Sequence, residues 1–353
     1  MAMSMRIQTA SAWWRAAFTA LVMAALALTM APRLHAAPSD DWSDTPAGQI
    51  LGAVVGVRSV VPDDARTAES LGTRRIGSGV LIDQSGLVLT IGYLMLEAVE
   101  AEVVLADGRT VSAKSLAYDH DSGFGLLRVA DALNTRPIEL GESAALEEGA
   151  QVLVVSGGQP ARVLPATVTD RRPFAGYWEY LLEDAIFTFP PHPRYGGAAL
   201  IGRDGRLLGI GSLLVRDIGG TNQGVPGNMF VPIDRLKPIL ADLMATGRRS
   251  EPPHPWLGLF AAEGEGRVFV TRIAGGGPAE EAGIKPGDII IGVAGKRVAD
   301  LADFLRKVWA QGNAGVVVPL DVLPMTSNGD LEIKRVQIRS GDRHDWLKLR
   351  AAD

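Results

Sequence analysis

Short apolar segments alternate with turn residues along residues 50–233 of the 353-residue chain. Asp107-Gly108 and Asp204-Gly205 stand between such segments and predict tight hairpins, the second of which joins Ala198–Ile201 to Leu207–Ile210. Evenly spaced short strands with few helical periods favour an all-β sandwich or barrel over a parallel sheet. The other strand candidates are 50–61, 79–83, 87–90, 102–105, 110–114, 125–129, 152–155, 163–168 and 180–186.

The pattern changes after Asp234, where apolar residues recur at helical spacing as far as Leu243. Gly247 is a plausible end for this helix, and the polar, proline-containing stretch 248–255 is typical of a linker. We therefore expect a first domain at 48–247. The apolar residues of this helix are Leu236, Ile239, Leu240 and Leu243.

A second block, residues 256–340, combines strand candidates with one amphipathic helix that Asp300 can cap. This pattern predicts a small antiparallel sheet with one helix, followed by a tail at 341–353. Its strand candidates are 268–272, 289–293, 316–322 and 331–338. The apolar face of the helix consists of Leu301, Phe304, Leu305 and Val308.

The N-terminal residues have the features of an export signal. Arg6 and Arg15 precede an apolar run at 16–31, and Leu34-His35-Ala36 follows as a cleavage motif. This arrangement predicts a signal peptide at 1–36 and a polar linker at 37–47, and hence a periplasmic protein of a Gram-negative cell. An uncleaved anchor in the inner membrane, facing the periplasm, is the alternative, although the run is shorter than the about 20 residues that a span needs.

Composition excludes several kinds of site. The chain has no cysteine, which rules out disulfides, thiolate metal sites and cysteine nucleophiles. Its net charge is −5, and removal of residues 1–36 would take away three arginines and no acid, giving −8. Such a balance argues against nucleic acid as a partner.

Two segments of the second block resemble a PDZ domain of the bacterial type, namely Glu281–Ile290 and Val293–Val298. In such a domain a loop offers backbone N–H groups to a terminal carboxylate, and the peptide adds as a strand beside a helix. The resemblance implies that this loop is Trp256, Leu257, Gly258 and Leu259, and that Leu301, Phe304, Leu305 and Val308 belong to the helix beside the peptide. The alternative is a groove that the chain fills itself.

The first domain resembles the HtrA/Deg family of trypsin-like serine proteases. The matching segments are Gly77–Asp83 with Gly86–Thr90, Leu105–Arg109, Asp119–Val129 and Phe230–Ile233. The resemblance implies a trypsin-like double β-barrel over 48–247, followed by a PDZ domain (α+β).

The residues that carry the family's chemistry are missing at the matching positions. Tyr93 stands where the base histidine belongs, Gly123 where the orienting aspartate belongs, and Tyr195 where the nucleophilic serine belongs. Pro193 replaces the glycine that donates an N–H to the oxyanion, and proline has no such N–H. The resemblance therefore predicts no catalytic residue of the family's type.

The remaining histidines, serines and acidic residues do not predict a replacement catalytic site. His120 and Ser122 would lie about 7 Å apart on an extended segment, beyond hydrogen-bond reach. His192 lies near Tyr195 in sequence, so one possibility is a tyrosine–histidine cluster in the cleft that corresponds to the family's active site. The alternative is that Tyr93 and Tyr195 fill this cleft. Asp119-His120-Asp121 is more typical of a solvated loop than of a metal site, so neither a metal nor a cofactor is assigned.

The function expected from these observations is binding. A pseudoprotease would capture unfolded or C-terminal segments of envelope proteins through its PDZ domain and act as a scaffold, a chaperone-like factor or a regulator in protein quality control. An active HtrA/Deg homologue is a second expected partner, and the family's trimers make a homo-oligomer conceivable. The alternatives are an active serine-type endopeptidase with a rearranged site and a holdase that shields unfolded chains.

Overall fold

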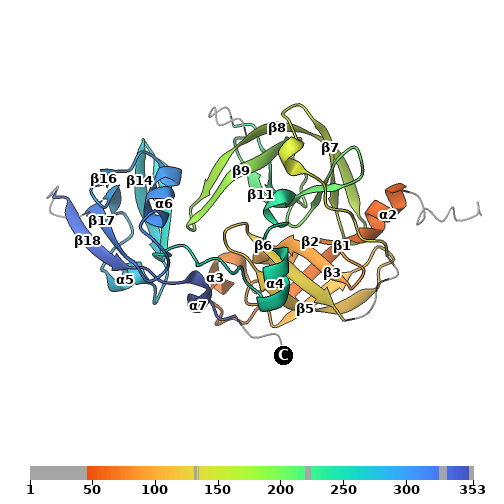
Figure 1. Cartoon of the computed structure of the whole chain (residues 1–353), viewed down its shortest axis with the longest axis horizontal. Coiled ribbons are helices and arrows are strands. Elements are labelled where there is room, and N and C mark those ends of the chain that lie inside the picture. Colours follow the sequence, from red (N-terminus) through yellow and green to blue (C-terminus); the bar gives the residue numbers. More distant parts are fainter. Residues whose placement is uncertain (1–45, 131–132, 134, 219–223, 326–331, 350–353) are drawn as a thin grey trace, which may run out of the picture. The chain divides into compact units, whose positions relative to one another are not determined.

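The computed structural model describes residues 46–130, 133, 135–218, 224–325 and 332–349. The predicted signal peptide and most of the linker that follows it lie outside this range. Among the described residues, no helix is long and apolar enough to cross a membrane. The chain is mainly β, as its turn-separated apolar segments predict, with two closed barrels and a smaller third sheet (Figure 1).

The first barrel closes in the strand order β1-β2-β3-β6-β5-β4. Its antiparallel neighbours pair in register, for example Val55 with Gly79 and Val88 with Leu127. The buried apolar side chains of these strands belong to one continuous core, which extends into the second barrel. The strands are β1 (Val54–Val60), β2 (Arg74–Leu81), β3 (Leu87–Ile91), β4 (Glu100–Val104), β5 (Thr110–Tyr118) and β6 (Phe124–Val129).

The second barrel closes in the order β10-β11-β12-β9-β8-β7. The predicted hairpin around Asp204-Gly205 is confirmed as β10 and β11. β8 and β9 form a hairpin much longer than the predicted strands, and its turn lies at Tyr177–Glu179. The strands are β7 (Gln151–Ser156), β8 (Arg162–Gly176), β9 (Tyr180–Phe189), β10 (Ala199–Ile201), β11 (Leu207–Val215) and β12 (Gly227–Pro232).

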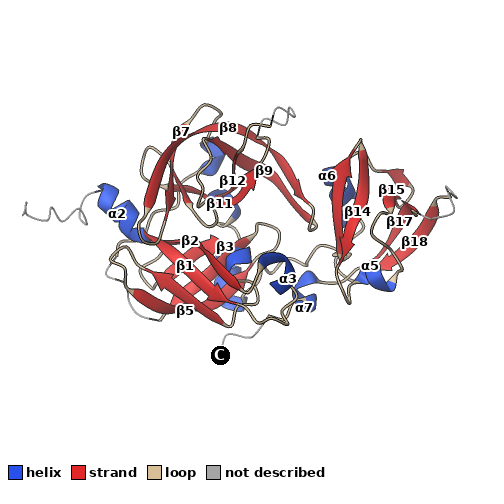
Figure 2. Ribbon diagram, turned by 180° about the vertical axis from the view of Figure 1, so that it is seen from behind, coloured by secondary structure: helices blue, strands red, loops and turns tan. Residues whose placement is uncertain are grey.

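The third sheet has the order β13-β14-β15-β17-β18, with β16 paired to β15. Helix α6 (Leu301–Trp309) begins at the predicted cap, since the Asp300 side chain accepts a hydrogen bond from the Asp303 N–H at 2.7 Å. β13 was not predicted from the sequence. The strands, drawn in red in Figure 2, are β13 (Leu259–Gly264), β14 (Arg267–Ile273), β15 (Ile289–Val293), β16 (Lys296–Arg297), β17 (Val317–Leu323) and β18 (Lys334–Arg339).

One strand prediction and one helix prediction require correction. The strand expected at 50–61 begins only at Val54, because residues 46–53 form helix α2 (Pro46–Ala53), and proline is well suited to the first helical position. Helix α4 is limited to Leu240–Thr246, since Pro238 has no N–H for a continuous helix from Asp234. Gly247 ends α4 in the left-handed conformation, as expected. The remaining short helices are α3 (Ala68–Leu71), α5 (Pro278–Glu281), α7 (Arg343–Trp346), η2 (Gly92–Leu94), η3 (Ser143–Ala145) and η4 (Ile233–Arg235).

Candidate functional site

Tyr93, which the sequence comparison above matches to the base histidine, lies in the short helix η2 that follows β3. Its hydroxyl donates a hydrogen bond to the carbonyl oxygen of Ser212 in β11 at 2.9 Å. Burial, together with the neighbouring Tyr195, raises the pKa of Tyr93 above its usual value. The phenol is therefore protonated at neutral pH and acts as a donor, which is the opposite of what a general base requires.

Gly123, which the sequence comparison above matches to the orienting aspartate, lies in the turn between β5 and β6 with a φ of 80°. Its carbonyl oxygen accepts a hydrogen bond from Gly92 N–H at 2.7 Å, which ties this turn to the residue before Tyr93. A Cβ atom built on Gly123 would lie 3.5 Å from the hydroxyl of Tyr180. An aromatic side chain therefore faces the place from which an aspartate would extend.

The loop with Pro193 and Tyr195 is held by backbone hydrogen bonds. The Gly196 carbonyl accepts from Ser78 N–H at 2.8 Å, and the Tyr195 carbonyl accepts from Ala198 N–H at 2.9 Å. Gly197 has a φ of 72°, and a Cβ atom there would lie 1.8 Å from the Ser78 carbonyl oxygen. Only glycine fits this position, so close packing of the backbone fixes the shape of this loop.

A single cavity of about 290 Å³ brings Tyr93, Gly123 and Tyr195 together. The two tyrosines do not fill it, contrary to the simplest expectation from the sequence. Aromatic rings make up much of its wall, and Trp178 stacks on Tyr180 at 5.5 Å between ring centroids. The other aromatic side chains in the wall are Tyr118, Tyr177, Phe260 and Trp346.

His120, rather than His192, is the histidine in this wall. Its Nε2 donates to the carbonyl oxygen of Glu179 at 3.1 Å and its Nδ1 accepts from the Tyr118 hydroxyl at 2.9 Å, an assignment that satisfies both partners. Burial lowers the pKa of His120 well below its usual value, so the ring is neutral. His192 is buried elsewhere and accepts from Arg194 N–H. Among the described residues, no hydrogen bond joins a serine hydroxyl to a histidine ring.

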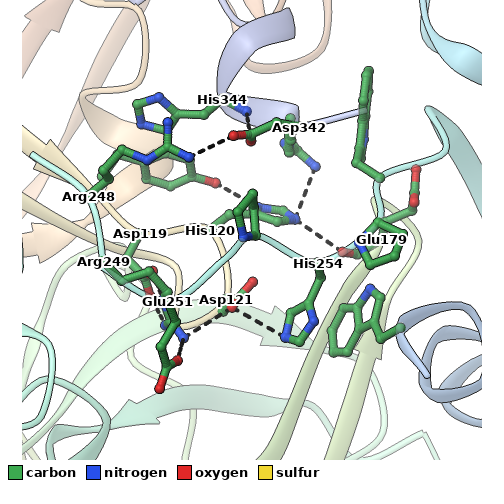
Figure 3. A pocket seen from close by; sticks show the side chains of 16 residues that line it. Asp119, His120, Asp121, Glu179, Arg248, Arg249, Glu251, His254, Asp342 and His344 are labelled. Atoms are coloured by element: carbon green, nitrogen blue, oxygen red, sulfur yellow. Dashed lines mark hydrogen bonds and ion pairs between the residues drawn. The ribbon is translucent and has the colours of Figure 1, made fainter. Parts of the chain in front are cut away.

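The acidic segment around His120 is not a solvated loop, which corrects the interpretation from sequence. Asp119 accepts from Nε and Nη2 of Arg249 in the linker, both at 2.7 Å (Figure 3). Asp121 lies 3.1 Å from Nη1 of the same arginine and 3.5 Å from Nε2 of His254. These acids therefore attach the linker to the first barrel.

The PDZ loop proposed from sequence contains Leu257 and Leu259, whose N–H groups both donate to the side chain of Glu179 at 2.8 Å. Gly258 between them has a φ of 77°, a conformation that favours glycine. Trp256 is buried and pairs with Gly341 through an isolated bridge. The loop thus holds a carboxylate that belongs to the turn of the β8–β9 hairpin.

The predicted peptide-contacting residues of α6 are all buried in the apolar cluster of the third sheet. Leu181 of β9 belongs to the same cluster, and Ala175 of β8 packs against it. The hairpin therefore contributes apolar surface to the PDZ core. The four buried residues of α6 are Leu301, Phe304, Leu305 and Val308.

Comparisons with known proteins agree with this architecture. Residues 77–210 match the trypsin-like peptidase domain, and residues 269–323 match the PDZ domain. The serine protease Do-like HtrA of Bacillus subtilis is 26% identical over 74% of this chain and 63% of its own length. The chain is thus similar to HtrA/Deg proteases, with a trypsin-like peptidase domain followed by one PDZ domain.

Other relatives are similar to this chain at comparable levels of identity. A probable periplasmic serine endoprotease, DegP-like, of Pseudomonas fluorescens is 28% identical over 75% of this chain and 56% of its own length. The solved structure of the HtrA-type protease AlgW with a decapeptide matches 87% of this chain and 98% of that chain, with a TM-score of 0.51 and 19% identity. This structural match supports the fold alone. The chain covers 63% of the length of the Bacillus subtilis relative and 56% of the length of the Pseudomonas fluorescens relative.

The sequence did not point to Glu179, although its side chain accepts two hydrogen bonds from the PDZ loop. The available signal was the aromatic, glycine-containing turn Gly176-Tyr177-Trp178-Glu179, since two adjacent large rings at a hairpin tip are typical of a contact surface. Glu179 also has a φ of 58°, and a non-glycine residue in the left-handed region costs about 1 kcal/mol. Two hydrogen bonds from the PDZ loop offset this cost.

Glu179 should make stability depend on pH. Burial raises the pKa of Glu179 from 4.5 to about 7. The N–H donors of the PDZ loop and the Arg343 guanidinium act in the opposite direction but do not cancel this effect. His120, whose Nε2 contacts the carbonyl oxygen of Glu179, is neutral because burial lowers its pKa well below the usual value. Because the folded chain binds this proton more tightly than the unfolded chain, the stabilisation is complete below pH 4.5 and is lost as the pH rises through about 7.

We therefore expect the wild type to lose stability relative to Glu179→Gln between pH 5 and pH 8, by up to about 3 kcal/mol. Urea unfolding at four pH values measures this difference. Glu148→Gln, at an exposed position of the chain, should run parallel to the wild type. Parallel curves for the wild type and Glu179→Gln would contradict the raised pKa.

Proposed function

We propose that this HtrA/Deg chain is a pseudoprotease that binds peptides or protein C-termini through its PDZ domain. One observation carries the proposal: the cavity at the catalytic position holds Tyr93, Gly123 and Tyr195 together, with no nucleophile–base pair among them. Acyl transfer by the family's mechanism needs a hydroxyl activated by a histidine. A partly buried, protonated phenol that donates to the Ser212 carbonyl does not supply that base.

The oxyanion site supports the same conclusion. Pro193 has no N–H, and loss of one oxyanion donor commonly lowers the rate about 100-fold to 1000-fold. This loss adds to that of the nucleophile and the base. The function then rests on binding, as a scaffold, a chaperone-like factor or a regulator of envelope protein quality control.

Peptide binding is supported by the family and the fold. The matching structures of AlgW are described with a tripeptide and a decapeptide. Relatives from Pseudomonas and Haemophilus are named periplasmic, which supports an exported location. On this proposal the partners are unfolded or C-terminal segments of envelope proteins and an active HtrA/Deg homologue, with self-association as a trimer in the manner of the family.

Purified protein lacking residues 1–36 tests the loss of activity. We expect no cleavage of unfolded casein and no covalent labelling by a serine-directed fluorophosphonate probe, with an active HtrA/Deg protease as positive control. Cleavage that co-purifies with the chain through two chromatographic steps, or labelling of the chain itself, would establish the active endopeptidase instead.

Restoring only the serine should not restore activity. Tyr195→Ser keeps the loop held by Gly197 but leaves Tyr93 and Gly123 in the base and aspartate positions and Pro193 in the oxyanion loop. We expect fluorophosphonate labelling at the level of the wild type, because an unactivated serine is a weak nucleophile. Hydrolysis by this variant above the blank would show that the description of the site is wrong.

A further inference from the structure

The turn of the β8–β9 hairpin places a carboxylate where a PDZ domain receives the end of a peptide. Oε2 of Glu179 lies 2.8 Å from Leu257 N, and Oε1 lies 2.8 Å from Leu259 N. Both oxygens of one carboxylate thus accept from the loop on either side of Gly258. The Glu179 residue is only 4% exposed, so this carboxylate is enclosed by protein.

The same hairpin also contacts the strand that borders the groove. Ala261 N–H of β13 donates to the carbonyl oxygen of Tyr177 at 2.9 Å, the kind of main-chain bond that an added peptide strand makes. The ring of Tyr177 lies 6.2 Å from that of Phe260 on the same strand. Carboxylate and main-chain contacts therefore come from neighbouring residues of one turn, as they would from the last residues of a peptide.

The helix on the other side of the groove holds the hairpin as well. Nε and Nη2 of Arg306 in α6 donate to the two carboxylate oxygens of Glu183 in β9, at 2.8 and 2.6 Å. Leu181, between Glu183 and the turn, is buried in the apolar cluster of α6. The hairpin thus contacts the loop, the strand and the helix that together define a PDZ groove.

We propose that the β8–β9 hairpin is an internal ligand of the PDZ groove, in which the Glu179 side chain takes the place of a peptide's terminal carboxylate. An external chain with a free C-terminal carboxylate binds only by displacing this turn. The inference rests on the proposed function of the PDZ domain in peptide binding and adds its regulation. Because the hairpin is covalently attached, its effective concentration at the groove is high. The apparent association constant for an external peptide is therefore the intrinsic constant multiplied by the fraction of molecules whose groove is open.

Glu179→Gln is the sharpest test, since it keeps the size of the side chain and replaces one acceptor oxygen by an amide that faces an N–H donor. The probe is a fluorescein-labelled pool of decapeptides with randomised last three residues and a free carboxylate, and the same pool amidated is its control. We expect the full chain with Glu179→Gln to bind the free-acid pool at least 10-fold more tightly than the wild type. Glu148→Gln, the exposed control, should bind like the wild type, and the amidated pool should bind weakly to all three.

Hydrogen exchange at the backbone amides of Leu257 and Leu259 gives a readout that needs no peptide. Both amides should be protected in the wild type and in Glu148→Gln, and should exchange at least 10-fold faster in Glu179→Gln, with the circular dichroism spectrum unchanged. Equal exchange in all three proteins would overturn the internal ligand. If exchange changes as expected but no protein binds the free-acid pool, the peptide-binding function and its displacement step fail while occupancy of the groove by the hairpin stands.

Discussion

Gly197→Ala is expected to destabilise the chain by about 3 kcal/mol. The Cβ atom would lie 1.8 Å from the carbonyl oxygen of Ser78, and the backbone on both sides is held by hydrogen bonds. A left-handed φ of 72° adds the usual penalty for a side chain. Neither group can move away cheaply, because Ser78 is part of β2 and Gly197 precedes β10. Urea unfolding followed by circular dichroism measures the loss.

Gly149→Ala is the matched control for this prediction. Gly149 has a φ of 82°, and a Cβ atom there would have no heavy atom within 4 Å. The substitution introduces the same backbone strain without the clash, so a loss of about 1 kcal/mol is expected. If both variants lose the same free energy of unfolding, close packing against Ser78 does not determine the conformation of the loop at Gly197.

Arg249→Ala is expected to cost about 3 kcal/mol, because it leaves a buried carboxylate without its partner. The Asp119 side chain is 3% exposed and accepts two hydrogen bonds from the Arg249 guanidinium. Asp119 keeps its hydrogen bond from Ser122 N–H, which does not neutralise its charge. Thermal unfolding should show a lower midpoint, with the linker at 248–255 released from the first barrel.

The double variant Arg249→Ala with Asp119→Asn separates charge from packing. Asparagine removes the uncompensated charge, so the double variant should be more stable than Arg249→Ala alone. A double-mutant cycle measures the interaction free energy between positions 119 and 249. Arg109→Ala provides a surface control: its pair with Asp107 is largely exposed, and a change within about 0.5 kcal/mol is expected. Additive effects of the two substitutions at 119 and 249 would show that the ion pair contributes nothing to the stability of the fold.

Local patterns predicted most of the secondary structure for physical reasons that act over short distances. The Asp300 cap and the apolar face of α6 depend on residues within one or two turns of helix, so both could be predicted from neighbours. The alternating strands of the barrels likewise carry their own pattern. The helix before Gly247 was predicted too long because the apolar periodicity was followed across Pro238. The first strand was predicted to begin before Val54 because Pro46 was not considered as the first residue of a helix.

The candidate site was only partly predictable. The positions of Tyr93, Gly123 and Tyr195 follow from motif spacing, and the structure brings all three to one cavity. That His120 rather than His192 lies in its wall depends on how distant loops pack. The pairing of Asp119 with Arg249 spans 130 residues of sequence, so no local pattern could predict it.

The sequence by itself determined the mainly β character and the small sheet with its capped helix, since each depends on residue identity or on neighbours along the chain. Only the tertiary structure decided what the PDZ loop binds. Glu179 and Leu257 are separated by 78 residues, and a single glutamate in a hairpin turn has no pattern that predicts its acceptor role. Burial and the approach of two backbone N–H groups decide that role, and both exist only once the chain has folded.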